Sequence, residues 1–147
     1  MLTLKVINEN PEEVISRLSK KNFDAKDIVN QIIDLDTVRR NSQTSLDGIL
    51  SEINSLSKSI GSLLKEGKKE EASNARDKVG KLKESSKELE VSLKNAQEKI
   101  DELLVTIPNL PHDSVPEGKG EEDNQVERSG GLMPSLPENA LPHWDLA

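Results

Sequence analysis

The side chains of this sequence that are best suited to chemistry are amines and guanidinium groups gathered in one stretch. The whole chain has a net charge of −7, yet residues 58–87 contain nine Lys or Arg against five Asp or Glu. A concentration of positive charge in an otherwise acidic chain favours contact with phosphate groups, although each single lysine also fits an ordinary solvated surface position. The candidate phosphate-contacting residues are Lys58, Lys65, Lys68, Lys69, Arg76, Lys78 and Lys83.

Catalytic and metal-binding patterns are weak. The chain has no cysteine, which excludes a thiol nucleophile and a thiolate metal site. His112 and Asp113 stand between prolines, where a turn explains them better than metal or acid–base chemistry. Gly118-Lys119-Gly120 lacks the spacing of a phosphate-binding loop. We therefore assign no catalytic, cofactor-binding or metal-binding residue, and expect that the chain by itself is not an enzyme.

Two heptad repeats predict the scaffold that positions the basic residues. Apolar and small residues alternate at spacings of four and three in two tracts, separated by a break at Gly67 that can end a helix. This pattern predicts an antiparallel coiled-coil hairpin with helices over about 25–65 and 70–107 and a tip at 66–69. The predicted core residues are Ile28, Ile32, Leu35, Arg39, Ser42, Leu46, Ile49, Ile53, Leu56, Ile60 and Leu63, then Ala72, Ala75, Val79, Leu82, Ser86, Leu89, Leu93, Ala96, Ile100, Leu103 and Ile107.

Folding the chain about Gly67 predicts which core residues face each other. Leu56 should meet Val79 in the distal half, and Arg39 should meet Ala96, which leaves room for the arginine stem. Arg40 lies outside the seam and can pair with a carboxylate four residues earlier. Helices of this length form a rod of about 60 Å at 1.5 Å per residue, so the basic residues should lie far from its base.

The two ends of the chain differ from the rod. After a short extended start, Asn10 and Pro11 are suited to begin a short helix that ends at Asn22-Phe23-Asp24. Beyond Ile107, six prolines exclude helix and predict one short strand around Asn124–Arg128, with the rest of the tail as loop or as a fragment without its packing partners. The fold class is therefore all-α. No signal peptide or membrane-spanning run is present, so we expect a cytoplasmic protein without a membrane partner.

Several stretches resemble the class II seryl-tRNA synthetase family. The segment Ile7–Val14 resembles the family's opening, a short strand followed by a helix, and Leu35-Asp36 with Arg39-Arg40 resembles its first arm helix. Leu103–Pro116 resembles the junction between arm and catalytic domain, and is the most specific match. Glu121–Asn124 and His143–Leu146 resemble later landmarks, except that Ala147 stands where the family usually has Gly.

The resemblance implies a division of the chain and a partner. Residues 1–107 would be the tRNA-binding coiled-coil domain, and residues 108–147 a linker with the truncated start of the catalytic domain. The arm would clamp the long variable arm of tRNA-Ser. With no aromatic residue between positions 28 and 107 to stack on bases, it would read backbone and shape.

The same resemblance assigns the chemistry to the whole ligase. The full-length enzyme would use ATP and Mg²⁺ to attach serine, and would be a homodimer in which one subunit's arm serves the other's active site. The fragment, lacking the dimerising domain, can be monomeric. The alternative is a structural or adaptor coiled coil that binds protein rather than RNA, and a third reading is that the fragment retains ligase activity.

Overall fold

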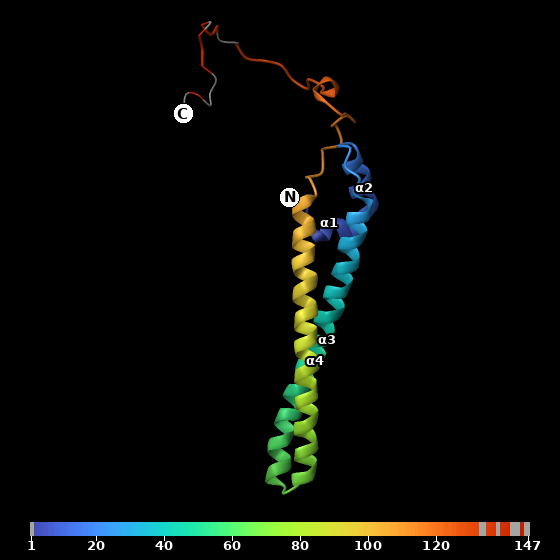
Figure 1. Ribbon diagram of the computed structural model, residues 1–147, viewed down its shortest axis with the longest axis vertical. Coiled ribbons are helices and arrows are strands. Elements are labelled where there is room, and N and C mark those ends of the chain that lie inside the picture. Colours follow the sequence, from blue (N-terminus) through green and yellow to red (C-terminus); the bar gives the residue numbers. More distant parts are fainter. Residues whose placement is uncertain (1, 133–134, 138, 142–144, 146–147) are drawn as a thin grey trace.

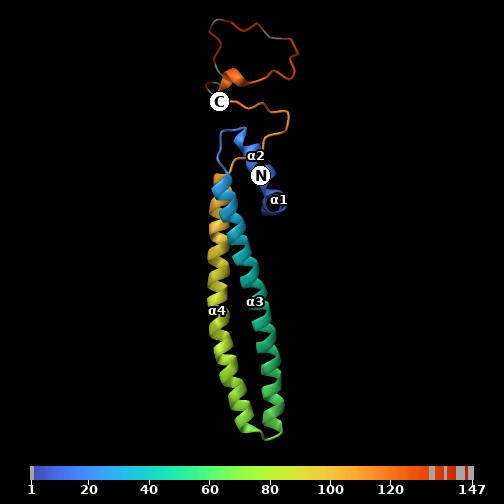
Figure 2. The same ribbon diagram turned by 90° about the vertical axis from the view of Figure 1, so that its right-hand side faces the viewer.

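The computed structural model describes residues 2–132, 135–137, 139–141 and 145. It contains the helices α1 (Leu4–Glu9), α2 (Pro11–Ser19), α3 (Lys26–Lys65) and α4 (Lys69–Thr106), and the short 3-10 turn η1 (Glu121–Asp123). Helices α3 and α4 run antiparallel and side by side along the length of the molecule (Figures 1 and 2). The described part of the chain contains no strand, so the predicted all-α class is confirmed.

The seam between α3 and α4 follows the heptad prediction. Every predicted core residue of both tracts is buried or half-buried, whereas most other residues of the two helices are exposed. The register also agrees, because the Ser42 hydroxyl lies 3.3 Å from the hydroxyl of Ser92, the neighbour of the predicted partner Leu93. Alternating spacings of four and three keep one stripe of each helix against the other, which is why the hairpin forms.

The tip closes through a glycine in the left-handed conformation. Gly67 has a φ of 78°. Its N–H donates to the Leu64 carbonyl at 3.2 Å, and the Lys68 N–H donates to the Leu63 carbonyl at 2.9 Å. These two bonds satisfy carbonyls that the end of α3 would otherwise leave without partners, a Schellman arrangement. The chain thus reverses direction within a few residues, and α4 begins at Lys69.

The best-packed part of the molecule lies at the base of the arm. There α1 and α2 pack against α3, and Ile7, Leu18, Val29 and Ile32 are completely buried. Farther along the arm most seam residues are only half-buried. Fully burying such an aliphatic side chain contributes roughly 1.5–3 kcal/mol, so the base anchors the arm while the distal seam holds two helices together with less buried surface.

Asn22 makes the connection from α2 to α3 possible. It adopts a positive φ of 53°, a conformation that asparagine tolerates better than most residues. The Asp24 carboxylate then accepts a hydrogen bond from the N–H of Lys26, the first residue of α3, at 3.2 Å. At the other end of α2, Asn10 occupies the N-cap position, but its side chain makes no capping hydrogen bond.

Two local predictions are wrong. Residues 4–9 are helical rather than extended, because burial of Ile7 and a bond from Asn8 to α3 favour a turn too short to be stable alone. Residues 124–128 form no strand. Val126 is 83% exposed there, and no neighbouring strand in the described residues offers backbone partners. Within the described ranges, no helix combines the length and hydrophobicity that crossing a bilayer requires.

Candidate nucleic-acid interface

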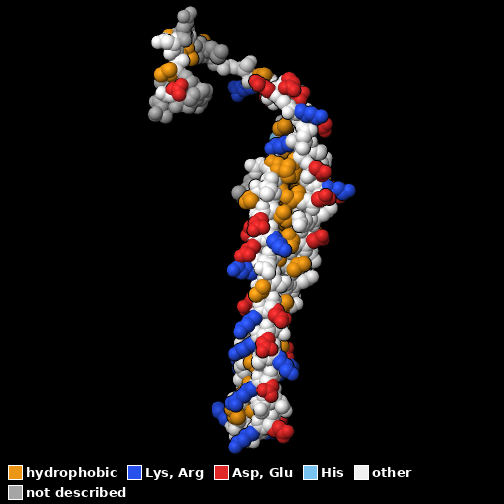
Figure 3. All heavy atoms as spheres, in the orientation of Figure 1, with side chains coloured by type: hydrophobic (Ala, Val, Ile, Leu, Met, Phe, Trp, Pro, Cys, Tyr) orange, Lys and Arg blue, Asp and Glu red, His pale blue; other side chains and the backbone are white. Residues whose placement is uncertain are grey.

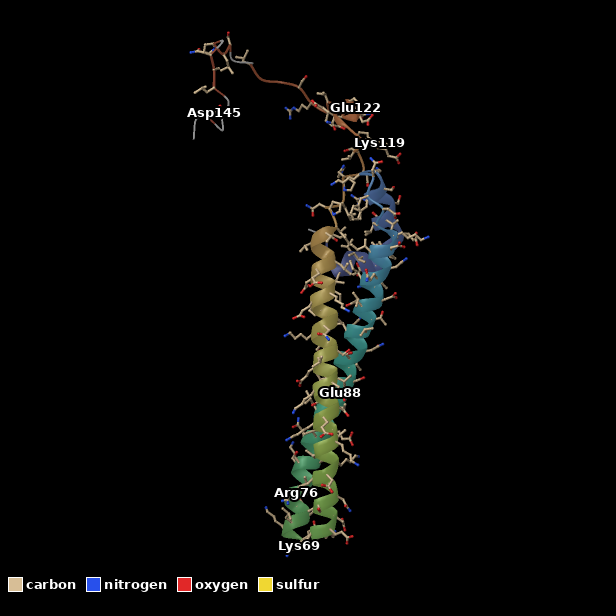
Figure 4. The ribbon with its side chains drawn as sticks, in the orientation of Figure 1. Lys69, Arg76, Glu88, Lys119, Glu122 and Asp145 are labelled. Atoms are coloured by element: carbon tan, nitrogen blue, oxygen red, sulfur yellow. The ribbon has the colours of Figure 1, made fainter. Side chains whose placement is uncertain are left out.

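The seven candidate contact residues are exposed and lie in the distal part of the arm. Figure 3 shows Lys and Arg side chains gathered over the tip and the turns next to it. Lys69 and Arg76 lie at this end, with Lys119 and Glu122 at the opposite end of the molecule (Figure 4). Because α3 has 40 residues and α4 has 38, the helices hold the charges at the tip on the order of 60 Å from the base, and Lys83 on the order of 35 Å from it.

Two of the seven cations are paired with acidic side chains. The Lys68 ammonium lies 2.8 Å from the Glu66 carboxylate, and the Lys78 ammonium lies 2.6 Å from the Glu52 carboxylate on the other helix. Among the described residues, the remaining five candidates make no ion pair within 4.0 Å. Exposed pairs of this kind contribute about 0–1 kcal/mol, so Lys68 and Lys78 can still exchange their carboxylates for another anion.

Such an arrangement can bind a polyanion through its backbone. Lysine ammonium groups act as mobile point charges that follow phosphates without reading bases. The arm carries no aromatic residue that could stack on an unpaired base. Its chemistry therefore fits a double-stranded nucleic acid, recognised by shape and phosphate contacts, better than a single strand.

Asp36 forms a cluster that sequence reasoning had found only in part. Its side chain is 4% exposed and accepts hydrogen bonds from Asn8 Nδ2 at 3.0 Å and Arg39 Nε at 2.9 Å. Arg40 Nε forms an ion pair with the same carboxylate at 3.0 Å and donates to the Asp36 backbone carbonyl at 3.4 Å. The predicted pair between Arg40 and the carboxylate four residues earlier is confirmed. The bond from Asn8 to Asp36 thus joins α1 to α3 at the base, and the two arginines beside Asp36 are separate from the distal cations.

The segment after α4 is fixed to α2, which the sequence did not reveal. The Arg17 guanidinium donates to the Pro111 carbonyl and lies 3.5 Å from the Asp113 carboxylate. Lys20 and Lys21 donate to the carbonyls of Asp113 and Asn109 at 3.0 and 2.8 Å. These bonds join residues about ninety positions apart, so no local pattern could have indicated them.

The turn residues considered for catalysis have structural partners. His112 Nδ1 lies 3.0 Å from the Ser114 hydroxyl, and the His112 carbonyl accepts the Val115 N–H, as in an ordinary turn. In the described ranges, no group of His, Cys, Asp and Glu side chains is arranged to hold a metal ion. The other histidine, His143, lies outside the described residues, as does Trp144.

The Gly118–Gly120 loop uses its amides internally. The Asp123 carboxylate accepts the N–H groups of Lys119 at 2.7 Å and of Gly120 at 3.4 Å. A carboxylate already occupies the donors that a phosphate would need, which agrees with the absence of a phosphate-loop spacing. The distal cations are therefore the part of the described chain that is best suited to bind phosphate.

Comparison with known proteins identifies relatives along the whole chain. Residues 1–111 match the model of the seryl-tRNA synthetase N-terminal domain. Serine–tRNA ligases of Salinibacter ruber and Akkermansia muciniphila are 38% and 37% identical over 147 residues, 100% of this chain and 34% of each relative. The ligase of Azorhizobium caulinodans is 39% identical over 150 residues, 99% of this chain and 34% of its own length. The chain thus spans about a third of the length of these relatives.

Proposed function

The chain belongs to the seryl-tRNA synthetase family, of which it carries the N-terminal domain, and on that premise we propose that its arm grips the long variable arm of tRNA-Ser. The contacts are phosphate and ribose contacts to a double-stranded stem, and the candidates for making them are Lys58, Lys65, Lys68, Lys69, Arg76, Lys78 and Lys83. In the whole ligase this grip would orient the acceptor end of the tRNA toward the active site.

The observation that carries the proposal is the placement of exposed cations at the end of a long arm. The seven residues lie within the turns closest to Gly67, while the apolar core is concentrated at the opposite end. A positive region that projects from the body accelerates encounter with a polyanion and loses strength as salt screens it. An arm that served only as a spacer would gain nothing from this placement.

The lack of aromatic residues supports shape readout. An A-form stem presents a wide, shallow minor groove with ribose hydroxyls, and its bases are stacked inside. Flexible lysine side chains can follow such a stem without reading its sequence. The variable arm is long in tRNA-Ser and short in most other tRNAs. Its presence then distinguishes tRNA-Ser from those tRNAs.

The remaining functions are proposed for the whole ligase. Serine activation would use ATP and Mg²⁺ at residues beyond those of the arm, and the enzyme would act in the cytoplasm as a homodimer whose arms cross between subunits. The chain alone is proposed to bind tRNA without aminoacylating it. An ATP–pyrophosphate exchange assay with serine tests this, because measurable exchange by the 147-residue chain would contradict it.

A comparison of two RNAs tests the proposed partner. Affinity for a tRNA-Ser transcript and for a transcript with a short variable loop is measured by fluorescence anisotropy at 50 and 200 mM salt. We expect tighter binding to tRNA-Ser, and a fall of about tenfold or more between the two salt concentrations. Equal affinity for both RNAs would contradict recognition of the variable arm, and an affinity independent of salt would contradict phosphate contact.

Charge reversal at the tip tests the site. The triple variant Lys65→Glu/Lys68→Glu/Lys69→Glu should lose most of its affinity for tRNA-Ser while keeping its helical circular dichroism. The matched control reverses three exposed lysines nearer the base, Lys26, Lys94 and Lys99. If the control loses as much affinity as the tip variant, binding follows net charge alone and the site assignment fails.

Sedimentation of the same samples tests the adaptor alternative. A coiled coil that binds protein through its seam should self-associate and should ignore tRNA. A monomeric chain that binds tRNA-Ser would instead agree with the proposed function.

A further inference from the structure

The two antiparallel helices give the arm two broad faces. One groove between them is lined by Gln43, Glu90 and Gln97, and the opposite groove by Val38 and Ser92 together with their neighbours. In a heptad repeat, residues seven positions apart lie on the same face. Each face can therefore be followed from these grooves to the tip.

Followed toward the tip, the first face carries cations that form no ion pair with any described residue. Seven-residue steps from Glu90 reach Lys83 and Arg76, and the adjacent row, four residues further on, contains Lys87 and Gly80. We call this the Lys83 face. On α3 it continues through Leu50, Ser57 and Leu64, with Asn54 and Gly61 in the adjacent row. The distal part of the Lys83 face, from Leu50 to Leu64 on α3 and from Ser73 to Lys87 on α4, contains three cations and no carboxylate.

The opposite face leads to a mixture of charges. Seven-residue steps from Ser92 reach Ser85 and Lys78, and steps from Val38 reach Ser45 and Glu52. The ion pair between Lys78 and Glu52 confirms that both residues lie on this second face, which we call the Lys78 face. The distal part of this face carries the cations Lys78 and Lys81 and the carboxylates Glu52, Glu66, Glu71 and Glu88.

The outer edges of the two helices divide in the same way. The edge of α3 away from α4 carries Lys58 and Lys65, whereas the corresponding edge of α4 carries Glu70, Asp77 and Glu84. Cations therefore occupy two adjoining sides of the distal arm, and carboxylates predominate on the other two. We propose that RNA lies against the Lys83 face and the α3 edge, and that the Lys78 face and the α4 edge point away from it. This inference rests on the proposed function and deepens it, because it assigns the side of contact, adds Lys87 to the candidate contacts and removes Lys78 from them.

Two glycines in the interior of the helices also indicate that the Lys83 face is the side that contacts RNA. Gly61 and Gly80 both lie on the Lys83 face, and a Cβ built on either would have no atom within 4 Å. Interior glycine weakens a helix relative to alanine, and no neighbour among the described residues requires its small size here. A bare stretch of helix lets a phosphate–ribose backbone approach closely between the cations. Gly48, which is equally open, lies nearer the base on the other side.

Matched double variants test the side of contact. Lys83→Gln/Lys87→Gln and Lys78→Gln/Lys81→Gln each remove two charges from consecutive turns of α4. With a tRNA-Ser transcript, we expect the first variant to lose about fivefold to tenfold in affinity at low salt and to lower the salt slope by about two. The second should stay within about twofold of the unchanged chain, with the same slope. Equal losses, or a larger loss from the second variant, would overturn the assignment.

Neutral substitutions of the glycines test close approach without changing charge. Gly61→Gln and Gly80→Gln should raise the midpoint of thermal unfolding, because glutamine is the better helix former, yet weaken binding of the tRNA-Ser transcript. Gly48→Gln should raise the midpoint and leave binding unchanged. Weakened binding by a stabilised protein cannot come from unfolding. If all three variants bind as the unchanged chain does, the close approach is wrong.

The experiment separates this inference from the function on which it rests. If the unchanged chain fails to bind tRNA-Ser, the proposed function fails. If it binds with the expected salt dependence while the two double variants lose affinity equally, only the side of contact is wrong.

Discussion

Replacing Asp36 with alanine should destabilise the whole domain, although the residue lies far from the tip. Its carboxylate accepts hydrogen bonds from Asn8 of α1 and from Arg39 of α3, and it forms an ion pair with Arg40. Removing it leaves the Asn8 amide and the Arg39 guanidinium without their acceptor and Arg40 without its ion-pair partner. The base contains the best-buried core, so a loss there affects the cooperative unit that supports the arm.

The expected size of the effect follows from the exposure of each partner. Breaking a fully buried ion pair costs about 3–5 kcal/mol, because the remaining charge stays buried. The Arg39 and Arg40 side chains are 30% and 58% exposed, so both can turn toward water and recover part of this cost. We therefore expect the free energy of unfolding to fall by about 2–3 kcal/mol, given that hydrogen bonds to charged groups contribute about 1.5–3 kcal/mol each.

Urea unfolding followed by circular dichroism measures this change. A suitable control is Asp47→Ala, which removes an exposed carboxylate of the same helix whose side chain accepts a hydrogen bond from Gln43. The control should change the free energy of unfolding by less than about 0.5 kcal/mol. If Asp36→Ala costs no more than this control, the cluster does not hold α1 and α3 together and the reasoning fails.

Three further predictions concern the tip, the seam and the junction. Gly67→Ala should lower the free energy of unfolding by about 1 kcal/mol, because residue 67 has a positive φ that alanine disfavours. Gly48→Ala should raise the free energy of unfolding, and thermal unfolding of both variants measures the two changes. Ile100→Ala should cost about 2–5 kcal/mol at its fully buried position, and Leu56→Ala, which is half-buried, should cost less in urea titrations. Arg17→Leu should release residues 109–113, so limited proteolysis should cut there faster than in the unchanged chain, and an equal cutting rate would contradict the role of Arg17.

The arm was predictable because its cause is local and repeated. Apolar residues such as Leu56 and Val79 recur at heptad spacing, and a helix turns this spacing into a continuous stripe whatever the rest of the chain does. The turn at Gly67 was predictable for a similar reason, since the left-handed position at the end of a helix favours glycine. The family resemblance came from short stretches with a particular order, which composition alone could not have provided.

Predictions at the two ends of the chain succeeded less often. A strand around 124–128 was proposed from pattern alone, but strands need partners, and none is present in the described chain. The extended start was wrong because the six-residue helix α1 is stabilised by burial of Ile7 and by the Asn8–Asp36 bond. Short elements depend on contacts whose partners are remote in sequence, and periodicity does not record those contacts.

Spacing along one helix is enough to predict the two stripes, the break between them and the gathering of cations near that break. How these features are arranged around each other depends on packing between separate helices. The placement of α3 against α4 pairs Lys78 with Glu52 and sets the side on which Lys83 lies. The placement of α2 beside the segment after α4 allows Arg17 to hold the junction. Packing of separate elements sets these relations, and a linear pattern of residues does not contain them.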